Sequence, residues 1–431
     1  RFLVNGGLTE KLSGKLIFGN NKHDGYTENL ITGNDLSLEE NYFGRAVFLY
    51  EGEEWEVLTS LDYEDNPSNE GTALHIVGST GFDVLNENGA LGTVVSSPDD
   101  RYEVTLDEDG EGSQTSQGFS VKASHDADVV SFTSITGYRA IENSFTRDSD
   151  NSPSTEIFDI SPLLGLPAGS LESNIAIVNT AVDDTWSASQ EFRLTSDYFM
   201  DGALFWTAGL YLFHDEGDRN EDFTVNFTGG IPQTQILELK GDTAALYGQA
   251  TYSMNDALDI TVGLRYSYES KEAVHSVYNG LPFFVDEDFT DAQIDKSWNN
   301  ISPKITVDYN ISLDVLVYGT YSEGFIGGGF NFGPATKLDA ETSSFDQEEA
   351  KNYEMGIKVS TFDDRLKYSL AAFYIDYSNL QIQSVNSTGA TTTANAGEAT
   401  SQGFEFEASL AATEGLTFNL AYAYVDATFD A

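Results

Sequence analysis

The chain has 431 residues, no Cys, and 70 Asp plus Glu against 21 Lys plus Arg, which gives a formal net charge of −49. The missing Cys excludes a disulfide-stapled module and a thiolate metal site. The acidic balance excludes nucleic acid as a partner, because phosphate binding requires a basic face. With 22 Tyr, 28 Phe and 39 Gly, the composition favours strands and tight turns over helices.

A strict alternation of apolar and polar residues recurs along the chain. Throughout 258–269, even positions are apolar or aromatic and odd positions are polar or Gly, and 301–310, 353–360 and 404–410 repeat the pattern. Such a period of two predicts strands with one apolar and one polar face. In chain order we expect sixteen strands, at about 1–5, 11–22, 41–50, 54–65, 114–124, 128–146, 184–196, 202–217, 242–254, 257–273, 297–309, 313–323, 349–361, 365–385, 397–411 and 415–428.

The length of these strands and the rhythm of their connections favour a membrane barrel over a soluble sheet. No stretch reaches 18 consecutive apolar residues, so a transmembrane helix is not expected, but most strands exceed the roughly 9–11 residues that cross a bilayer. Connections alternate between short turns and long loops, as in outer-membrane barrels. The long loops are expected at about 24–40, 66–113, 147–183, 218–241, 274–296, 324–348 and 386–396.

The two faces of the strands carry the chemistry that such a barrel needs. Leu204, Trp206, Leu210 and Leu212 lie on one apolar face, which suits lipid. The opposite faces bear charges, which indicates a wet or plugged lumen or ion pairs between neighbouring strands. The fold class is therefore all-β, a transmembrane antiparallel up-and-down β-barrel.

Several segments, in order along the chain, resemble those of TonB-dependent receptors. The segment from Tyr318 to Asn331 reads YGTYSEGFIGGGFN, and Glu348 to Lys358 contains the family's Tyr-Glu-x-Gly-x-Lys pattern. Further pieces that fit the family are Gly6–Leu12, Gln190–Ser196, Asn300–Lys304, Ala372–Gln381 and Asn395–Glu405. Together these segments are spread in order across essentially the whole chain.

The resemblance implies an active transport receptor of the Gram-negative outer membrane. Members of the family form about 22 strands around an N-terminal plug that carries the box gripped by TonB. With about sixteen strands expected, residues 1–431 are interpreted as one partial barrel domain, an internal fragment without the plug and the C-terminal strands. The expected ligand is a ferric siderophore or similar iron complex, with cobalamin and oligosaccharides as alternatives.

No catalytic constellation, metal site or cofactor site is predicted, so we expect no enzyme. The five His residues have no ligand spacing, and the acidic run 107–112 lacks the spacing of an EF-hand loop. Aromatic and amide side chains in the long loops and the glycine-rich rim segment are the candidate ligand contacts, although packing between loops would use them equally well. These candidates are Phe82, Tyr102, Phe145, Phe158, Phe325, Phe330 and Asn331.

The expected partners follow from the same interpretation. They are the TonB complex, through the plug and its TonB box, outer-membrane lipid and lipopolysaccharide, and an extracellular iron chelate, and the barrel is expected to be a monomer. Two alternatives remain open at this stage. A passive porin or channel would share the strand and loop pattern, and a secreted β-protein would have to cover its apolar face with protein.

Overall fold

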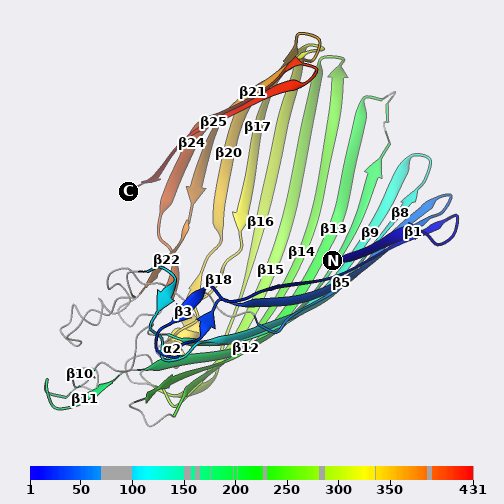
Figure 1. The fold of residues 1–431 in the computed structure, drawn as a ribbon. Helices are drawn as coiled ribbons and strands as arrows, with labels where there is room; N and C mark the ends of the chain where they lie inside the picture. The colour runs from blue at the N-terminus through cyan, green and yellow to red at the C-terminus, as the bar shows by residue number, and fades with distance from the viewer. Residues whose placement is uncertain are drawn as a thin grey trace.

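The protein folds into one large antiparallel sheet in a computed structural model, which describes residues 1–68, 100–149, 157–159, 161, 166–174, 176–197, 199–200, 202–226, 231–280, 287–334, 336–385 and 391–430. Sixteen strands follow one another in chain order, and each is antiparallel to its neighbours (Figure 1). This confirms the predicted all-β, up-and-down arrangement and the number of strands. The strands are β1 (Phe2–Gly7), β2 (Leu12–His23), β5 (Glu39–Glu51), β6 (Trp55–Asn66), β8 (Glu111–Asp126), β9 (Val130–Asp148), β12 (Ile177–Ser196), β13 (Leu204–Val225), β14 (Gln233–Asn255), β15 (Leu258–Tyr278), β16 (Phe289–Ser312), β17 (Val315–Ile326), β20 (Glu348–Thr361), β21 (Leu366–Ser378), β24 (Glu398–Thr413) and β25 (Leu416–Asp430).

The sheet curves around a lumen, and its two edges are β1 and β25 (Figure 1). Within the described residues these two strands do not pair with each other, so the barrel is not closed. The curvature follows from the right-handed twist of neighbouring strands, which accumulates across a sheet of this width. Side chains of alternate residues therefore point either into the lumen or outward.

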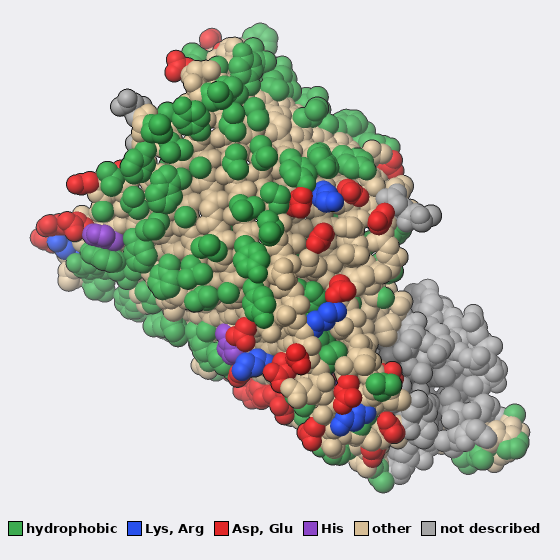
Figure 2. Space-filling model, turned by 180° about the vertical axis from the view of Figure 1, so that it is seen from behind, with side chains coloured by type: hydrophobic (Ala, Val, Ile, Leu, Met, Phe, Trp, Pro, Cys, Tyr) green, Lys and Arg blue, Asp and Glu red, His purple; other side chains and the backbone are tan. Residues whose placement is uncertain are grey.

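The outward face is apolar and exposed. On β15, Val262 and Leu264 are 52% and 55% exposed, whereas Thr261 and Ser267 on the lumen face are 8% and 2% exposed. Val262 of β15 pairs with Ile305 of β16, so the apolar face continues from one strand to the next. Figure 2 shows hydrophobic side chains spread over this outer face, with most of the charged side chains toward one end and others along the opposite edge. An apolar surface this wide matches hydrocarbon as its solvent.

The two rims differ in their connections. Short turns join β2 to its neighbour β1 and, further along, β14 to β15 and β20 to β21, all at one rim. The long connections lie at the other rim and carry the remaining secondary structure. These elements are β3 (Thr27–Asn29), β4 (Asp35–Leu36), β7 (Glu103–Val104), β10 (Ile157–Asp159), β11 (Glu172–Asn174), β18 (Gly329–Phe330), α2 (Lys337–Thr342), β19 (Ser344–Phe345), β22 (Gln381–Val385) and β23 (Thr391–Asn395).

The central strands extend much further toward the long-loop rim than the sequence pattern predicted. The loops expected at 218–241 and 274–296 are largely strand, because β13 continues to Val225, β14 begins at Gln233 and β16 begins at Phe289. The error has a physical cause. Beyond the apolar band both faces of these strands carry polar residues, such as Asp218 and Glu238 on the outward face and Glu221 and Gln235 on the inward face. The alternation that marks a strand therefore disappears while the hydrogen-bond ladder continues.

Hydrophobic side chains are buried mainly in small clusters at the long-loop rim. One cluster joins Leu237, Ala273, Trp298 and Phe330, and another joins Leu36, Val104 and Leu106. Within the described ranges the single helix is α2, and no helix there is long and apolar enough to cross a membrane. The clusters fix the rim segments on the ends of the strands, which positions the candidate site.

Candidate functional site

A cavity of about 840 Å³ opens on the lumen side of the long-loop rim. Residues of β9, β12, β13, β14 and β15 form its walls, and the segment after β18 covers part of it. Its lining combines charged, amide and apolar side chains, a mixture that is typical of small-molecule sites. The lining side chains used below are Arg147, Asp183, Arg219, Glu221, Phe223, Leu237, Leu239, His275 and Phe332.

Two guanidinium groups flank one aromatic ring beside this cavity. The Cζ atoms of Arg147 and Arg219 lie 5.1 Å and 5.7 Å from the ring centroid of Phe145. The three residues come from β9 and β13, which are brought together because both strands pair with β12. Cation–π contacts of this length stabilise the position of a guanidinium group without using its N–H donors.

Hydrogen bonds orient both arginines further. Arg219 forms ion pairs with Asp183 at 3.5 Å and with Glu221 at 3.2 Å. Arg147 donates from Nε to Oδ1 of Asn179 at 3.1 Å, and the fully buried Asn179 donates to Glu221 at 2.9 Å. The network leaves the two arginines in different electrostatic situations, since Arg219 is paired with carboxylates and Arg147 with a neutral amide.

His275 forms part of the cavity wall and carries no charge at neutral pH. It is 5% exposed and its ring meets that of Phe289 edge-on, with centroids 5.6 Å apart. Burial lowers the pKa of His275 from 6.5 to about 4, against the smaller opposing effect of Glu221. The cavity therefore contains a neutral imidazole next to its two guanidinium groups.

This burial predicts a pH-dependent loss of stability at the rim. An unfolded chain protonates His below about pH 6.5, whereas the folded rim resists protonation until about pH 4. The stability contributed by neutral His275 is complete above pH 6.5 and declines as the pH falls toward 4, by on the order of 3 kcal/mol. We expect the fall in the thermal unfolding midpoint between pH 7 and pH 4.5 to be smaller for His275→Gln than for wild type. His125→Gln, at the opposite rim, serves as the control, and an equal effect of both variants would contradict the prediction.

The glycine-rich segment is packed tightly against the strands below it. A Cβ atom on Gly328 would lie 2.4 Å from Cε2 of Trp298, so this approach requires Gly. Next along the chain, Phe330 is 6% exposed and its ring centroid lies 6.2 Å from that of Trp298. Asn331 accepts a hydrogen bond from the backbone N–H of Thr393 at 2.6 Å and donates to the Thr393 carbonyl at 2.9 Å. The segment thus connects β16 with the β22–β23 hairpin. These contacts fix the position of Phe332–Pro334, the residues that cover part of the cavity.

The lumen wall nearer the short-turn rim is also polar. Arg193 contacts Glu191 at 2.6 Å, and the hydroxyl of Tyr247 donates to the same carboxylate. Arg265 lies over the rings of Tyr211 and Tyr247, with distances of 5.8 Å and 6.0 Å from its Cζ atom to the ring centroids. These inward-facing charges and hydroxyls fit a hydrated or protein-filled lumen and not a packed apolar core.

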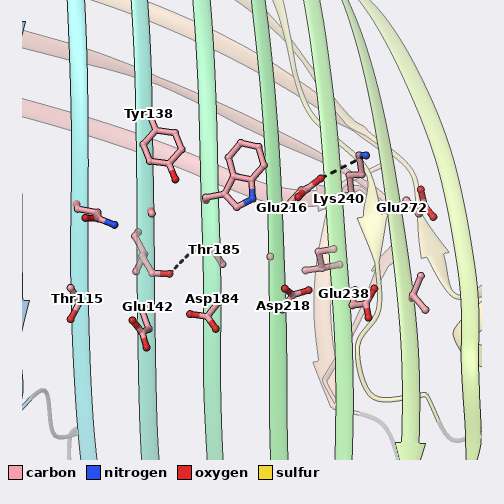
Figure 3. Close-up of a pocket in the computed structure, with 17 residues that line it drawn as sticks. Thr115, Tyr138, Glu142, Asp184, Thr185, Glu216, Asp218, Glu238, Lys240 and Glu272 are labelled. Carbon is pink, nitrogen blue, oxygen red and sulfur yellow. Dashed lines mark hydrogen bonds and ion pairs between the residues drawn. The ribbon is translucent and has the colours of Figure 1, made fainter.

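The outer face has a second hollow, of about 620 Å³, beyond the apolar band. A row of stacked or tilted rings borders it: Tyr138 and Trp186 have centroids 6.1 Å apart, and Trp186 and His214 are 5.0 Å apart. Aromatic rows of this kind mark the membrane boundary of outer-membrane barrels. Figure 3 shows the acidic side chains that line the hollow across neighbouring strands, with Lys240 paired to Glu216 at 3.7 Å. The lining carboxylates are Glu142, Asp184, Glu216, Asp218, Glu238 and Glu272.

Comparison with known proteins agrees with this architecture. The model of the TonB dependent receptor-like β-barrel family matches residues 54–431. The chain belongs to this family. Among curated proteins, this TonB-dependent receptor barrel is 29% identical to the pesticin receptor of Yersinia enterocolitica over 195 residues, 44% of the chain and 27% of the relative. It is 34% identical to the metal-pseudopaline receptor CntO of Pseudomonas aeruginosa over 139 residues, 32% of the chain and 18% of the relative.

Solved structures of siderophore receptors share the fold of this receptor barrel. The ferric yersiniabactin uptake receptor FyuA of Yersinia pestis superposes with a TM-score of 0.73 at 18% identity, covering the whole chain and 58% of FyuA. The ferripyoverdine receptor of Pseudomonas aeruginosa, solved with ferripyoverdine, superposes with a TM-score of 0.66 at 15% identity, covering 99% of the chain and 54% of that receptor. The chain therefore spans a little over half the length of these receptors.

The ligand contacts predicted from the sequence are distributed unevenly in the receptor barrel. Phe145 lies between the two arginines beside the cavity, and Phe330 and Asn331 hold its cover. Tyr102 is 45% exposed beside Arg101 and immediately precedes β7 of the small sheet formed by β3, β4 and β7. Phe325 is half-buried on the outward side of β17. Two candidates are not placed by their side chains: Phe82 lies outside the described residues, and Phe158 lies on β10, where only the backbone is described.

The sequence interpretation missed the cationic part of the cavity. Arg147 and Arg219 stand out as two of the chain's 21 basic residues, and both lie at inward-facing positions of their strands. The signal that could have found them is this combination of rare charge and strand parity. Phe332 and His275 have no comparable signal, since their place in the wall depends on packing at the rim.

Among the residues that the structure describes, no group of three or more His, Cys, Asp or Glu could hold a metal ion. In the acidic run 107–112, burial raises the pKa of Asp109, but hydrogen bonds from Thr32, Asn34 and Asn29 outweigh it and hold the pKa below its ordinary value. That carboxylate ties two rim segments together. The family consists of transport receptors, which fits a protein without enzymatic activity.

Proposed function

We propose that this chain is the barrel of an outer-membrane receptor that binds a ferric siderophore or a similar iron complex and imports it with energy delivered through TonB. The observation that carries the proposal is the lumen cavity at the long-loop rim of a TonB-dependent receptor barrel. A ligand there is held by rigid strand ends on the side from which an extracellular chelate would arrive. The cavity volume, about 840 Å³, suits a ligand of siderophore size.

The similar proteins support this choice of ligand class. Structures with the same fold include uptake receptors for ferric yersiniabactin and ferripyoverdine. A second candidate, a complex of a metal other than iron, is favoured by the 34% identity to the metal-pseudopaline receptor over 139 residues. Cobalamin, oligosaccharides and passive diffusion through a porin have no such support among these proteins.

The proposed mode of action has two further parts. A plug domain would occupy the polar lumen, where Glu191, Arg193 and Arg265 offer charged partners for it, and TonB would pull on that plug. The apolar outer face would contact outer-membrane lipid, with lipopolysaccharide beyond the aromatic row, and the receptor would act as a monomer. The location proposed for the protein is the Gram-negative outer membrane.

Iron supply should control the amount of the receptor if iron is its cargo. We expect the full-length receptor to rise at least about tenfold in the source organism on iron starvation, because production of an energised importer is useful when its cargo is scarce. Quantitative proteomics of outer membranes from iron-replete and iron-starved cultures measures this. An unchanged amount under iron starvation, together with a rise on starvation for another metal, would favour the second candidate.

Direct binding tests the proposal at the level of the protein. Purified full-length receptor in detergent is titrated with ferric chelates of different donor types and with the same chelators without metal, using quenching of Trp fluorescence as the readout. Binding of at least one ferric chelate with preference over its metal-free form is the expected result. Failure of every iron chelate would contradict the proposed function.

A further inference from the structure

The two hollows at the long-loop end of the strands differ in how their charges are balanced. The outer hollow is lined by six carboxylates and one ammonium group, Lys240, in keeping with the net charge of −49. The lumen cavity contains two guanidinium groups, of Arg147 and Arg219, beside the three carboxylates of Asp183, Asp218 and Glu221. A chain with few basic residues therefore places two of them in the wall of this lumen cavity.

The acidic side chains of the lumen cavity do not neutralise both arginines. Glu221 is bound by Arg219 at 3.2 Å and by the amide of Asn179 at 2.9 Å. Asp183 is bound by Arg219 at 3.5 Å and by Asn143 at 3.3 Å. Both carboxylates are thus committed to the Arg219 side of the cavity. Asp218 also borders the cavity, but it lies at an outward-facing position of β13, opposite Asp184 and Glu238, and pairs with neither arginine among the described residues. His275 is neutral.

Arg147 is left as the available cation. In the described parts of the chain no carboxylate lies within 4 Å of its guanidinium group, and its Nη atoms donate no hydrogen bond there. Its Nε atom donates a hydrogen bond to Asn179, and its guanidinium group lies over the ring of Phe145. The side chain is therefore exposed but has a fixed orientation. A pre-oriented guanidinium group with free N–H donors is suited to bidentate binding of a carboxylate or of paired phenolate oxygens.

The rest of the cavity wall combines apolar side chains with the polar ones of Gln114, Asn143, Thr185, Gln233 and Gln235. Phe223, Leu237 and Leu239 line it from β13 and β14, and Phe332 closes it from the glycine-rich segment. Such walls stabilise aromatic rings or aliphatic arms of a ligand by burying their surface. Within the described part of the cavity, a guanidinium group without a carboxylate partner lies beside apolar side chains, and this combination selects a ligand with an anionic end and apolar parts.

We infer that Arg147 is a specificity-determining residue, which binds anionic oxygen donors of the chelate and makes the receptor select negatively charged, aromatic iron chelates over neutral ones. This inference rests on the proposed function, because it concerns the same site. Arg219 contributes by holding Phe145 and the two carboxylates in place, and Arg147 contacts the ligand.

The test compares chelates of different charge on the purified full-length receptor. The probes are the ferric tris complex of 2,3-dihydroxybenzoate, which is anionic and aromatic, and the neutral ferric tris complex of acetohydroxamate. Wild type is expected to bind the anionic complex at least about tenfold more tightly, and Arg147→Gln is expected to lose about 10- to 100-fold of this affinity. Arg147→Lys, which keeps the charge but not the planar donor pair, should fall between the two.

Arg139→Gln is the matched control. Arg139 lies on the same strand and the same lumen face, but it is paired with Asp62 at 2.8 Å and does not line the cavity. Its replacement should leave the affinity for both complexes unchanged. Increasing salt should weaken binding of the anionic complex to wild type more than to Arg147→Gln, which a merely structural role of Arg147 would not produce.

The possible outcomes separate this inference from the proposed function. Equal affinities of wild type for the two complexes, or wild-type affinity in a folded Arg147→Gln receptor, would overturn the role of Arg147 and leave an iron receptor of different specificity. Binding of neither complex would overturn the inference together with the choice of iron chelates as ligands. Thermal unfolding of each variant verifies that the barrel is intact.

Discussion

Replacing Val262 by Arg is expected to destabilise the refolded full-length barrel by about 2–4 kcal/mol, because the new charge would lie in the hydrocarbon layer. Val262 is 52% exposed on the outward face of β15, near the middle of its apolar band, and faces Ile305 on the neighbouring strand. A guanidinium group at this depth has no partner and must reach the interface or draw water into the bilayer. Urea unfolding of the receptor in lipid vesicles measures the cost.

The control for this substitution is Gln249→Arg. Gln249 of β14 lies on the lumen face, opposite Gly263 of β15. Its side chain is half-buried and lies beside the charged side chains of the lumen wall. A new charge there stays hydrated, so we expect a cost of no more than about 1 kcal/mol. Similar costs for Val262→Arg and Gln249→Arg would refute the assignment of the apolar face to lipid.

Replacing Trp298 by Ala should have the second large effect, a loss of about 3–5 kcal/mol that is confined to the long-loop rim. Trp298 is 6% exposed and packs with Phe330, Leu237 and Ala273. Its indole N–H donates to Asp346 at 3.2 Å, so the residue fixes both ends of the glycine-rich segment. Without it, the segment 327–347 loses the surface on which it rests and should open locally while the strands stay paired.

Limited proteolysis distinguishes local from global loss. Cleavage within 327–347 should become at least about tenfold faster in Trp298→Ala than in wild type, in line with the lost packing energy. The thermal unfolding midpoint of the barrel should change little by comparison. Trp298→Phe keeps most of the buried surface and loses the hydrogen bond, so its cleavage rate should lie near that of wild type. Unchanged cleavage in Trp298→Ala would show that other contacts hold the segment.

The position of the strands was predictable because their signal is local. In a barrel between lipid and water each strand alternates within its own sequence, as β15 does from Leu258 to Tyr268, and no knowledge of its neighbours is needed. The same reasoning failed where lipid ends. Along Asp218–Val225 of β13 and Gln233–Asp242 of β14 the outward face is mostly polar and the inward face mixes charged, amide and apolar residues, so the hydrogen-bond ladder continues without a clear alternation of hydropathy.

The candidate site was only partly predictable. Phe145, Phe330 and Asn331 were found because aromatic and glycine-rich loop segments attract attention, but Arg147, Arg219 and His275 were not. Their grouping depends on the register of pairing, which places Arg219 opposite Asp183 in β12 and Leu237 opposite both Arg219 and His275. A shift of register by one residue would turn each of these side chains to the other face.

The amino-acid sequence by itself determined the class of fold, the number of strands, the two rims and the family, since all of these rest on short-range periodicity and on motifs that survive within single strands. The tertiary structure decided how far the strands reach beyond the membrane, which loops fold onto the rim, and which charges meet in the lumen. Those features depend on contacts between strands far apart in the chain. For Arg147, the difference between a surface charge and an available ligand donor lies in its neighbours: Asn179 and Phe145 hold it, and the nearby carboxylates are bound by Arg219.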